Sequence, residues 1–163
     1  MVRVLQGSCH CGEVRFMVNS STPVPYQLCL CSICRKVGGS GGSINLGGHA
    51  DSLKILQGKE HISVYKAVLN RGTDHQEIAD SERNFCSKCS TMLWLFDPTW
   101  PELIHPFASA IDNDLETPTE MTCIMVDSKP DYVRLPEGAK DVYAEYPSMS
   151  LENWHKKHNK FVE

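Results

Sequence analysis

The sequence predicts a mostly β protein, built from antiparallel sheets with short helical turns and a C-terminal helix. Apolar and polar residues alternate in several short segments, most clearly at Val14, Phe16 and Val18. Turn-forming residues separate these segments, and only one stretch of the chain has clear helical spacing. Many short strands divided by turns are typical of antiparallel, mostly β domains.

Each expected element rests on a local pattern. The expected strands lie around 14–18 and 53–55, from Ile62 onward, and at 92–96, 103–110 and 121–126. A helix is expected after Pro147, with Ser150 as its N-cap. Its packed face would carry residues at helical spacing, which are Leu151, Trp154, His155 and His158. A shorter helical turn is expected at 32–37, because the glycines that follow would end it.

Composition limits the classes of function. The 163 residues, 18.3 kDa in mass, suit one domain that spans 1–163. Sixteen Lys and Arg against twenty Asp and Glu give a net charge of −4, without a basic cluster that would bind a nucleic-acid backbone. The first residues lack the apolar core of a signal peptide, and no apolar run reaches membrane-spanning length. We therefore expect a cytoplasmic protein that has neither nucleic acid nor membrane as a partner.

The eight cysteines are the unusual feature of the composition. Disulfides are rare in a reducing compartment, so the spacing of the cysteines indicates metal ligation. Seven of them fall into three groups: Cys9-His-Cys11, Cys29-Leu-Cys31-Ser-Ile-Cys34 and Cys86-Ser-Lys-Cys89. The eighth, Cys123, lies in an apolar segment and is expected in the core.

The first and third groups can form one four-cysteine site. A C-x2-C pair such as Cys86 and Cys89 places two thiolates around a tight turn, within reach of one tetrahedral ion. On an extended segment, Cys9 and Cys11 would project from the same face. Because the two groups lie far apart in the sequence, an ion between them would close a long loop.

The middle group offers three thiolates and has no obvious fourth protein ligand. Three ligands with one open coordination position are typical of a catalytic zinc, and four ligands of a structural zinc. The alternatives are buried free cysteines, or one four-cysteine site with spare thiols. A histidine could also close the second site, and the histidines without a spacing signal are His49, His61, His75 and His105. His10, between two proposed ligands, is expected at the surface.

Three segments resemble the signature blocks of a known family. They are Gly7-Ser-Cys-His-Cys-Gly-Glu-Val-Arg-Phe16, Cys29-Leu-Cys-Ser-Ile-Cys-Arg-Lys-Val-Gly-Gly39 and Phe85-Cys-Ser-Lys-Cys-Ser-Thr-Met-Leu-Trp94. In order, spacing and flanking glycines they are similar to the glutathione-dependent formaldehyde-activating enzyme (GFA) family, which also contains centromere protein V (CENP-V). The resemblance extends more weakly to 126–132 and to Trp154-His155. Ser90 and Tyr132 depart from the pattern, since the family usually has glycine and tryptophan there.

The resemblance implies an Mss4-like β fold and two zinc ions. It implies a structural zinc on Cys9, Cys11, Cys86 and Cys89. It implies a catalytic zinc, more loosely held and so more easily lost, on Cys29, Cys31 and Cys34.

The expected activity is that of a carbon-sulfur lyase or synthase of the S-(hydroxymethyl)glutathione synthase type. A small thiol, glutathione by the resemblance, would bind at the three-cysteine zinc and add to formaldehyde or another small electrophile. The alternative is a non-catalytic, zinc-stabilised module that binds another protein.

Further candidates for substrate contact follow the middle group. Arg35 and Lys36 could meet a glutathione carboxylate, or form a solvated pair of surface cations. Gly39 and Ser40 belong to a loop of small residues. Such a loop would let a peptide-like ligand approach the backbone, or form a flexible turn between strands.

Overall fold

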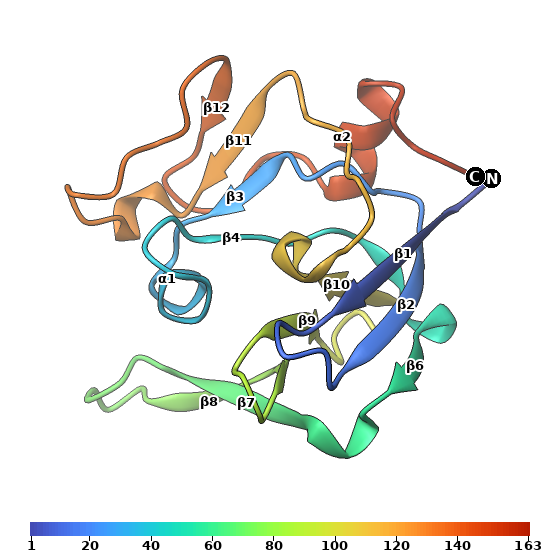
Figure 1. The fold of residues 1–163 in the computed structure, drawn as a ribbon. Coiled ribbons are helices and arrows are strands. Elements are labelled where there is room, and N and C mark those ends of the chain that lie inside the picture. Colours follow the sequence, from blue (N-terminus) through green and yellow to red (C-terminus); the bar gives the residue numbers. More distant parts are fainter.

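The computed structural model describes residues 1–163 and arranges them in three β-sheets with two short α-helices (Figure 1). The predicted fold class is confirmed: the chain is mostly β, its sheets are largely antiparallel, and a helix lies near the C-terminus. Of the predicted four-cysteine site, Cys9 and Cys11 follow a strand of one sheet, and Cys86 and Cys89 begin at the end of a strand of another. The sheets therefore decide where the thiols meet.

The first sheet has the order β1-β2-β6 and is antiparallel throughout. Its strands are β1 (Arg3–Ser8), β2 (Arg15–Ser20) and β6 (Lys54–Gln57). Burial alternates along β2 as the sequence predicts, with Phe16 and Val18 fully buried. The turn that joins β1 to β2 carries the first cysteine pair.

The second sheet has the order β5-β10-β9-β8-β7, and every pairing in it is antiparallel. Its strands are β5 (Gly48–His49), β7 (Ile62–Leu69), β8 (Glu77–Cys86), β9 (Met92–Phe96) and β10 (Leu103–Pro106). β7 and β8 form a long hairpin that runs along the lower edge of the molecule in Figure 1. The last cysteine pair starts where β8 ends, so it too follows directly on a strand.

The third sheet has the order β12-β11-β3-β4 and differs from the expected antiparallel pairing. Its strands are β3 (Gln27–Cys29), β4 (Ser43–Ile44), β11 (Met121–Ile124) and β12 (Lys140–Val142). β3 and β4 are antiparallel, whereas β11 runs parallel to both β3 and β12. Parallel neighbours need a long connection. More than half of the chain lies between β3 and β11, so the connection between these two strands is long enough for parallel pairing.

Aromatic packing joins the first and second sheets. The Phe16 ring of β2 lies edge-on against Trp94 of β9, with ring centroids 5.0 Å apart and an interplanar angle of 64°. Both belong to the largest buried cluster, which has 12 residues and also contains Cys9 and Cys86. Packing in the core thus fixes the position of one thiol from each of the two cysteine pairs.

Two expected strands end earlier than predicted. Of the strand expected at 103–110, β10 ends at Pro106 and a 3-10 turn covers Ala108–Ala110. Proline has no backbone N–H with which to continue a strand ladder. Of the strand expected at 121–126, β11 ends at Ile124, because Met125 adopts a left-handed backbone with φ 58°.

Both predicted helical segments are confirmed as α1 (Ser32–Gly38) and α2 (Leu151–Lys157). Ser150 caps α2 through its side chain, which accepts a hydrogen bond of 3.1 Å from the Asn153 N–H. Trp154 stacks on Tyr26 with ring centroids 3.6 Å apart, so α2 packs against the segment that leads into β3. None of the helices has the length and apolar character needed to span a membrane.

His155 links α2 to the rest of the fold. Its side chain is fully buried, and Nδ1 donates to the Leu151 carbonyl at 2.7 Å. Nε2 accepts from the Val24 N–H at 3.0 Å, so the neutral ring satisfies both contacts. Burial lowers the pKa of His155 below its ordinary value of 6.5, with the nearby His158 acting in the same direction and Glu116 opposing it.

Removal of this buried imidazole should change how stability depends on pH. As the pH falls, His155 takes up a proton at a higher pH in the unfolded chain than in the folded one. Its contribution to the free energy of unfolding is therefore complete above pH 6.5 and is lost as the pH falls toward the folded-state pKa. We expect His155→Gln to be about 1–3 kcal/mol less stable at neutral pH, with a gap that narrows as the pH falls. Urea unfolding across this range measures the difference.

The matched control is His75→Gln, because His75 lies exposed between β7 and β8. That variant should follow the parent protein at every pH. A gap between His155→Gln and the parent that stays constant with pH would show that His155 does not contribute in this way.

Candidate metal centres

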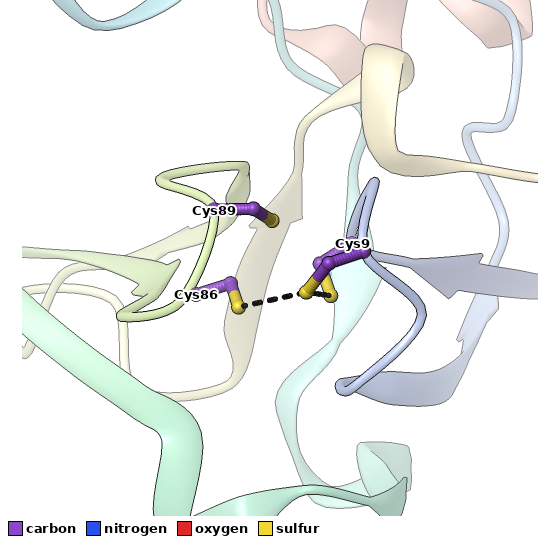
Figure 2. Close-up of side chains that lie close together, drawn as sticks. Cys9, Cys86 and Cys89 are labelled. Atoms are coloured by element: carbon purple, nitrogen blue, oxygen red, sulfur yellow. Dashed lines mark hydrogen bonds between the residues drawn. The ribbon is translucent and has the colours of Figure 1, made fainter.

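The structure brings Cys9, Cys11, Cys86 and Cys89 into one cluster. All of their Sγ atoms lie within 4.8 Å of one another. Figure 2 shows Cys86, at the end of β8, and Cys89, in the turn that follows, facing Cys9 on the segment after β1. The Sγ of Cys11 lies 3.5 Å from that of Cys9 and 3.9 Å from that of Cys86. Two short cysteine pairs from distant parts of the chain therefore share one site.

The first pair reaches this site from a turn, so the expectation that it lies on an extended segment is wrong. β1 ends at Ser8, and the Gly12 N–H donates to the Cys9 carbonyl at 3.0 Å. The Cys9 N–H in turn donates to the Val14 carbonyl at 3.0 Å. The chain has to reverse here because β1 and β2 are antiparallel neighbours. This tight turn, instead of a shared strand face, brings the two thiols together.

The four thiols fit a tetrahedral metal ion. An ion with metal–sulfur distances of about 2.3 Å holds its sulfurs about 3.8 Å apart, which matches the spacings of 3.5 and 3.9 Å. All eight cysteines are free thiols. A purely sulfur donor set favours soft or borderline ions such as zinc over magnesium or calcium.

Thr91 joins the two cysteine turns without any metal. Its Oγ1 accepts a hydrogen bond of 3.0 Å from the His10 N–H and lies 3.2 Å from Cys89 Sγ, to which its hydroxyl can donate. Sequence reasoning missed this residue, because its only signal is that it follows the last cysteine by two positions. Next to it, Ser90 takes a left-handed backbone with φ 64°, and its N–H donates to the Cys86 carbonyl at 2.8 Å. The serine therefore makes the turn for which the family usually has glycine.

Cys29, Cys31 and Cys34 form a second cluster, the triad, whose Sγ atoms also lie within 4.8 Å of one another. Cys29 ends β3, Cys31 is the N-cap of α1, and Cys34 lies in the first turn of that helix. The Cys31 Sγ accepts a hydrogen bond of 3.3 Å from the Cys34 N–H. No histidine, aspartate or glutamate joins either cluster at this spacing, so no histidine closes the triad.

In each cluster, hydrogen bonds favour ionisation of some thiols over the others. The contact with Thr91 lowers the pKa of Cys89 to about 5. In the triad, hydrogen bonds from Cys29 and then Cys34 lower the pKa of Cys31 to about 2, and the contact with Cys31 raises the pKa of Cys29 to about 11. The first charge thus opposes ionisation of its neighbours, and a cation would be needed for all the thiols to ionise together.

The small residues after α1 pack their backbone against the triad. Gly42 has φ +83°, and a Cβ there would lie 2.3 Å from the Cys29 carbonyl oxygen. The buried Ser43 hydroxyl donates to the Cys34 carbonyl at 3.0 Å. Gly38 leaves room for this hydroxyl, since a Cβ at Gly38 would lie 2.2 Å from Ser43 Oγ. These contacts shape the segment that carries the triad.

Arg35 fixes the other side of α1. Its Nε donates to the Leu30 carbonyl at 2.9 Å, and its Nη2 donates to the Ser128 carbonyl at 2.7 Å. The guanidinium thus holds the triad segment to the turn after β11, which sequence reasoning did not anticipate. Lys36 is exposed. Contact of Arg35 or Lys36 with substrate stays a prediction.

The other residues that the sequence singled out are either exposed to solvent or fully buried. Gly39 and Ser40 are exposed at the end of α1, and a Cβ on Gly39 would meet no atom within 4 Å. Their contact with a ligand also stays a prediction. Cys123 is fully buried beside Leu28 and Leu30, which confirms it as a core residue. His10 is exposed, as expected.

Fold and clusters together define a mostly β protein with two thiol clusters that could each hold a metal ion. The family model described as "Glutathione-dependent formaldehyde-activating enzyme" matches residues 4–126. A Halomonas elongata protein with a provisional name as a glutathione-dependent formaldehyde-activating enzyme is 50% identical over 154 residues, which cover 93% of this chain and 94% of that protein. The chain therefore belongs to the glutathione-dependent formaldehyde-activating enzyme family.

A solved structure shares the fold. A crystal structure of a Rhodobacter sphaeroides protein matches with a TM-score of 0.53 and 21% sequence identity, over 67% of this chain and 89% of that one. At this identity the likeness concerns the arrangement of the backbone alone.

Metal bound by the four-cysteine cluster should stabilise the fold. Cys11 is exposed, so Cys11→Ser removes one thiol at little packing cost. We expect this variant to lose one equivalent of bound metal and roughly 3 kcal/mol or more of unfolding free energy. Elemental analysis and urea unfolding measure the two effects. The exposed neighbour variant His10→Ala should change neither, and an unchanged metal content in Cys11→Ser would contradict the prediction.

The guanidinium of Arg35 should affect the triad selectively. Loss of its two hydrogen bonds in Arg35→Ala frees α1 from the turn after β11, at a cost of about 1–3 kcal/mol. We expect metal to leave the triad at a lower chelator concentration while the four-cysteine cluster keeps its ion. A chelator titration followed by elemental analysis tests this. Lys36→Ala is the control, and equal retention in the two variants would refute the role given to Arg35.

Proposed function

We propose that this protein is a zinc-dependent enzyme that forms or breaks the carbon–sulfur bond between glutathione and formaldehyde. The observation that carries the proposal is the unequal number of thiols in the two clusters, four in one and three in the other. Four sulfurs complete a tetrahedral site, whereas three leave room for one more ligand. Family membership supports glutathione and formaldehyde as the substrates.

Each cluster would have its own task. Cys9, Cys11, Cys86 and Cys89 would hold a structural zinc, and Cys29, Cys31 and Cys34 a catalytic zinc that is more easily lost. A zinc ion on the triad would supply a coordination position at which a substrate thiol is held as thiolate. The free state of all eight cysteines suits the reducing, cytoplasmic setting that we propose for the protein.

The reaction itself needs no oxidant. The glutathione sulfur attacks the formaldehyde carbon, the carbonyl π bond opens, and the oxygen takes up the proton that the thiol released. The product, S-(hydroxymethyl)glutathione, contains all the atoms of the two reactants, and the reverse reaction cleaves the same carbon–sulfur bond.

The residues around the triad would position the reactants. The Cys34 N–H keeps Cys31 Sγ oriented, and Arg35 holds the helix that carries both cysteines. The exposed backbone at Gly39 and Ser40 leaves one side open for a peptide-like substrate. Positioning of this kind accounts for a large share of the barrier reduction in reactions between two molecules.

A protein-binding module is the second candidate. Tyr132 and Tyr146 are 72% and 77% exposed, and such aromatic side chains are enriched at protein interfaces. A triad of thiols is not needed for such a role, so the enzymatic proposal explains more of the structure.

Loss of any triad thiol should abolish the activity while leaving the fold intact. Exchange spectroscopy by NMR on a mixture of formaldehyde and glutathione measures how fast the adduct forms, with and without zinc-loaded protein. We expect Cys29→Ala, Cys31→Ala and Cys34→Ala each to reduce the acceleration by at least about 100-fold, since outer-shell changes alone cost about 10–100-fold.

Cys123→Ala is the matched control, because Cys123 is buried outside both clusters. It should keep the full acceleration and the full zinc content. If parent protein with two bound zinc ions does not accelerate adduct formation at all, the protein-binding module is favoured instead.

A further inference from the structure

A cavity of about 450 Å³ lies between the second sheet and the C-terminal segment. We call it the α2 cavity and define it by six of its lining residues: His49, Trp100, Leu103, His105, Leu151 and Phe161. No cysteine lines it, so it is separate from both thiol clusters. Its volume falls in the range of about 300–1,000 Å³ that is typical of small-molecule sites.

The walls of the α2 cavity are largely apolar, and its apolar side chains are unusually open to solvent. Trp100 is 54% exposed and Leu103 is 37% exposed, although both are large apolar residues. Leu151 and Phe161 add half-buried apolar surface from α2 and the C-terminal tail. Large apolar side chains left exposed around a hollow are a feature of ligand sites, because a bound ligand covers them.

The charge of the lining favours a neutral ligand. Glu152 is the one acidic residue among the lining residues, and it is paired with Lys156 along α2. No lysine or arginine lines the cavity. An anionic ligand would therefore lose its hydration without gaining a cationic partner.

His105 provides an unpaired hydrogen-bond acceptor in the lining of the α2 cavity. It lies two residues after Leu103 on β10, so both side chains point to the same face of the sheet. Its Nδ1 lies 3.2 Å from the Leu46 carbonyl, which can only accept, so Nδ1 carries the proton and Nε2 does not. Burial lowers the pKa of His105, which keeps the ring neutral.

The Nε2 atom of His105 has no partner within the protein. It is also not enclosed, because the buried side-chain atoms without a partner are Asn45 Nδ2, Arg83 Nε and Trp154 Nε1. Because His105 lines the α2 cavity, its accessible and unpaired Nε2 can accept a hydrogen bond from a ligand there. In the second imidazole of the cavity, Nε2 already has a partner, since His49 Nε2 lies 3.0 Å from Ser21 Oγ.

We propose that the α2 cavity binds a small neutral phenol, whose hydroxyl group donates a hydrogen bond to Nε2 of His105. The apolar walls take the aromatic ring, and the bare nitrogen distinguishes a hydroxyl from an ether of the same shape. Because no cysteine lines the cavity, this site is independent of the thiol chemistry proposed above.

Phenol and its methyl ether anisole are the probes for this site, because they differ in the single hydrogen-bond donor. The three indole N–H signals in NMR spectra of zinc-loaded protein report on position, since Trp94 and Trp154 are buried and Trp100 lies at the cavity. We expect phenol to shift the Trp100 signal saturably, with a Kd at least about fivefold below that of anisole. His105→Phe should bring the affinity for phenol down to that of anisole.

His75→Phe, at an exposed site outside the cavity, should keep the preference of the parent protein. Equal affinities of the parent protein for phenol and anisole would overturn the proposal, and so would the absence of a saturable shift at Trp100. Both of these outcomes are measured on the unmodified chain, so they do not depend on whether a variant folds.

Discussion

The meeting of two cysteine turns is the constraint on which the rest of the structure depends. Cys11 and Cys86 lie 75 positions apart, yet their sulfurs are 3.9 Å from each other. Cys11 lies in the turn after β1 of the first sheet and Cys86 ends β8 of the second, so the cluster ties together the sheets that meet at Phe16 and Trp94. Closing so long a loop costs chain entropy, and a bound ion would offset that cost only in the folded state, where the thiols are already gathered. The contact of Thr91 with the His10 N–H indicates that the polypeptide itself brings the turns together.

The triad depends on the fold in a different way, because its three thiols come from one short segment. The N-cap of α1, the left-handed Gly42 and the Ser43 hydroxyl set its shape through contacts within about fifteen residues. Over longer distances the segment is anchored by the pairing of β3 with β11 at Cys29, and by Arg35, which donates to the Ser128 carbonyl. An ion at the triad closes no long loop, so its binding free energy adds less to folding than that of an ion in the four-cysteine cluster. This difference supports the proposal that the triad releases its zinc more readily.

The sequence predicted features that are encoded locally. Spacing identified both sets of clustered cysteines, and the Ser150 cap with its helical periodicity identified α2, because each signal lies within a few residues. The parallel pairing of β11 was missed, since strand direction depends on what a distant segment packs against. The same limit hid the positioning role of Arg35, whose acceptor at Ser128 lies 93 positions away and is a main-chain carbonyl that any residue would provide. The turn at Cys9 was missed because C-x-C spacing suits a strand and a tight turn equally well, and only the register of β1 with β2 decides between them.

The two clusters differ by one sulfur, and the ionisation of their thiols explains why that difference matters. In each, hydrogen bonds lower the pKa of some thiols, Cys9 and Cys89 in the first cluster and Cys31 in the triad, where this charge holds the pKa of Cys29 up at about 11. A cation reverses that opposition and draws every thiol of a cluster into the same charge state. In the first cluster the chain supplies all four sulfurs, so no substrate is needed to complete the set. The triad has three, and at the end of α1 the exposed Gly39 leaves space, since a Cβ there would meet no atom within 4 Å. In the proposed reaction, a substrate thiol would supply the fourth sulfur of the triad, which the fold provides for itself in the first cluster.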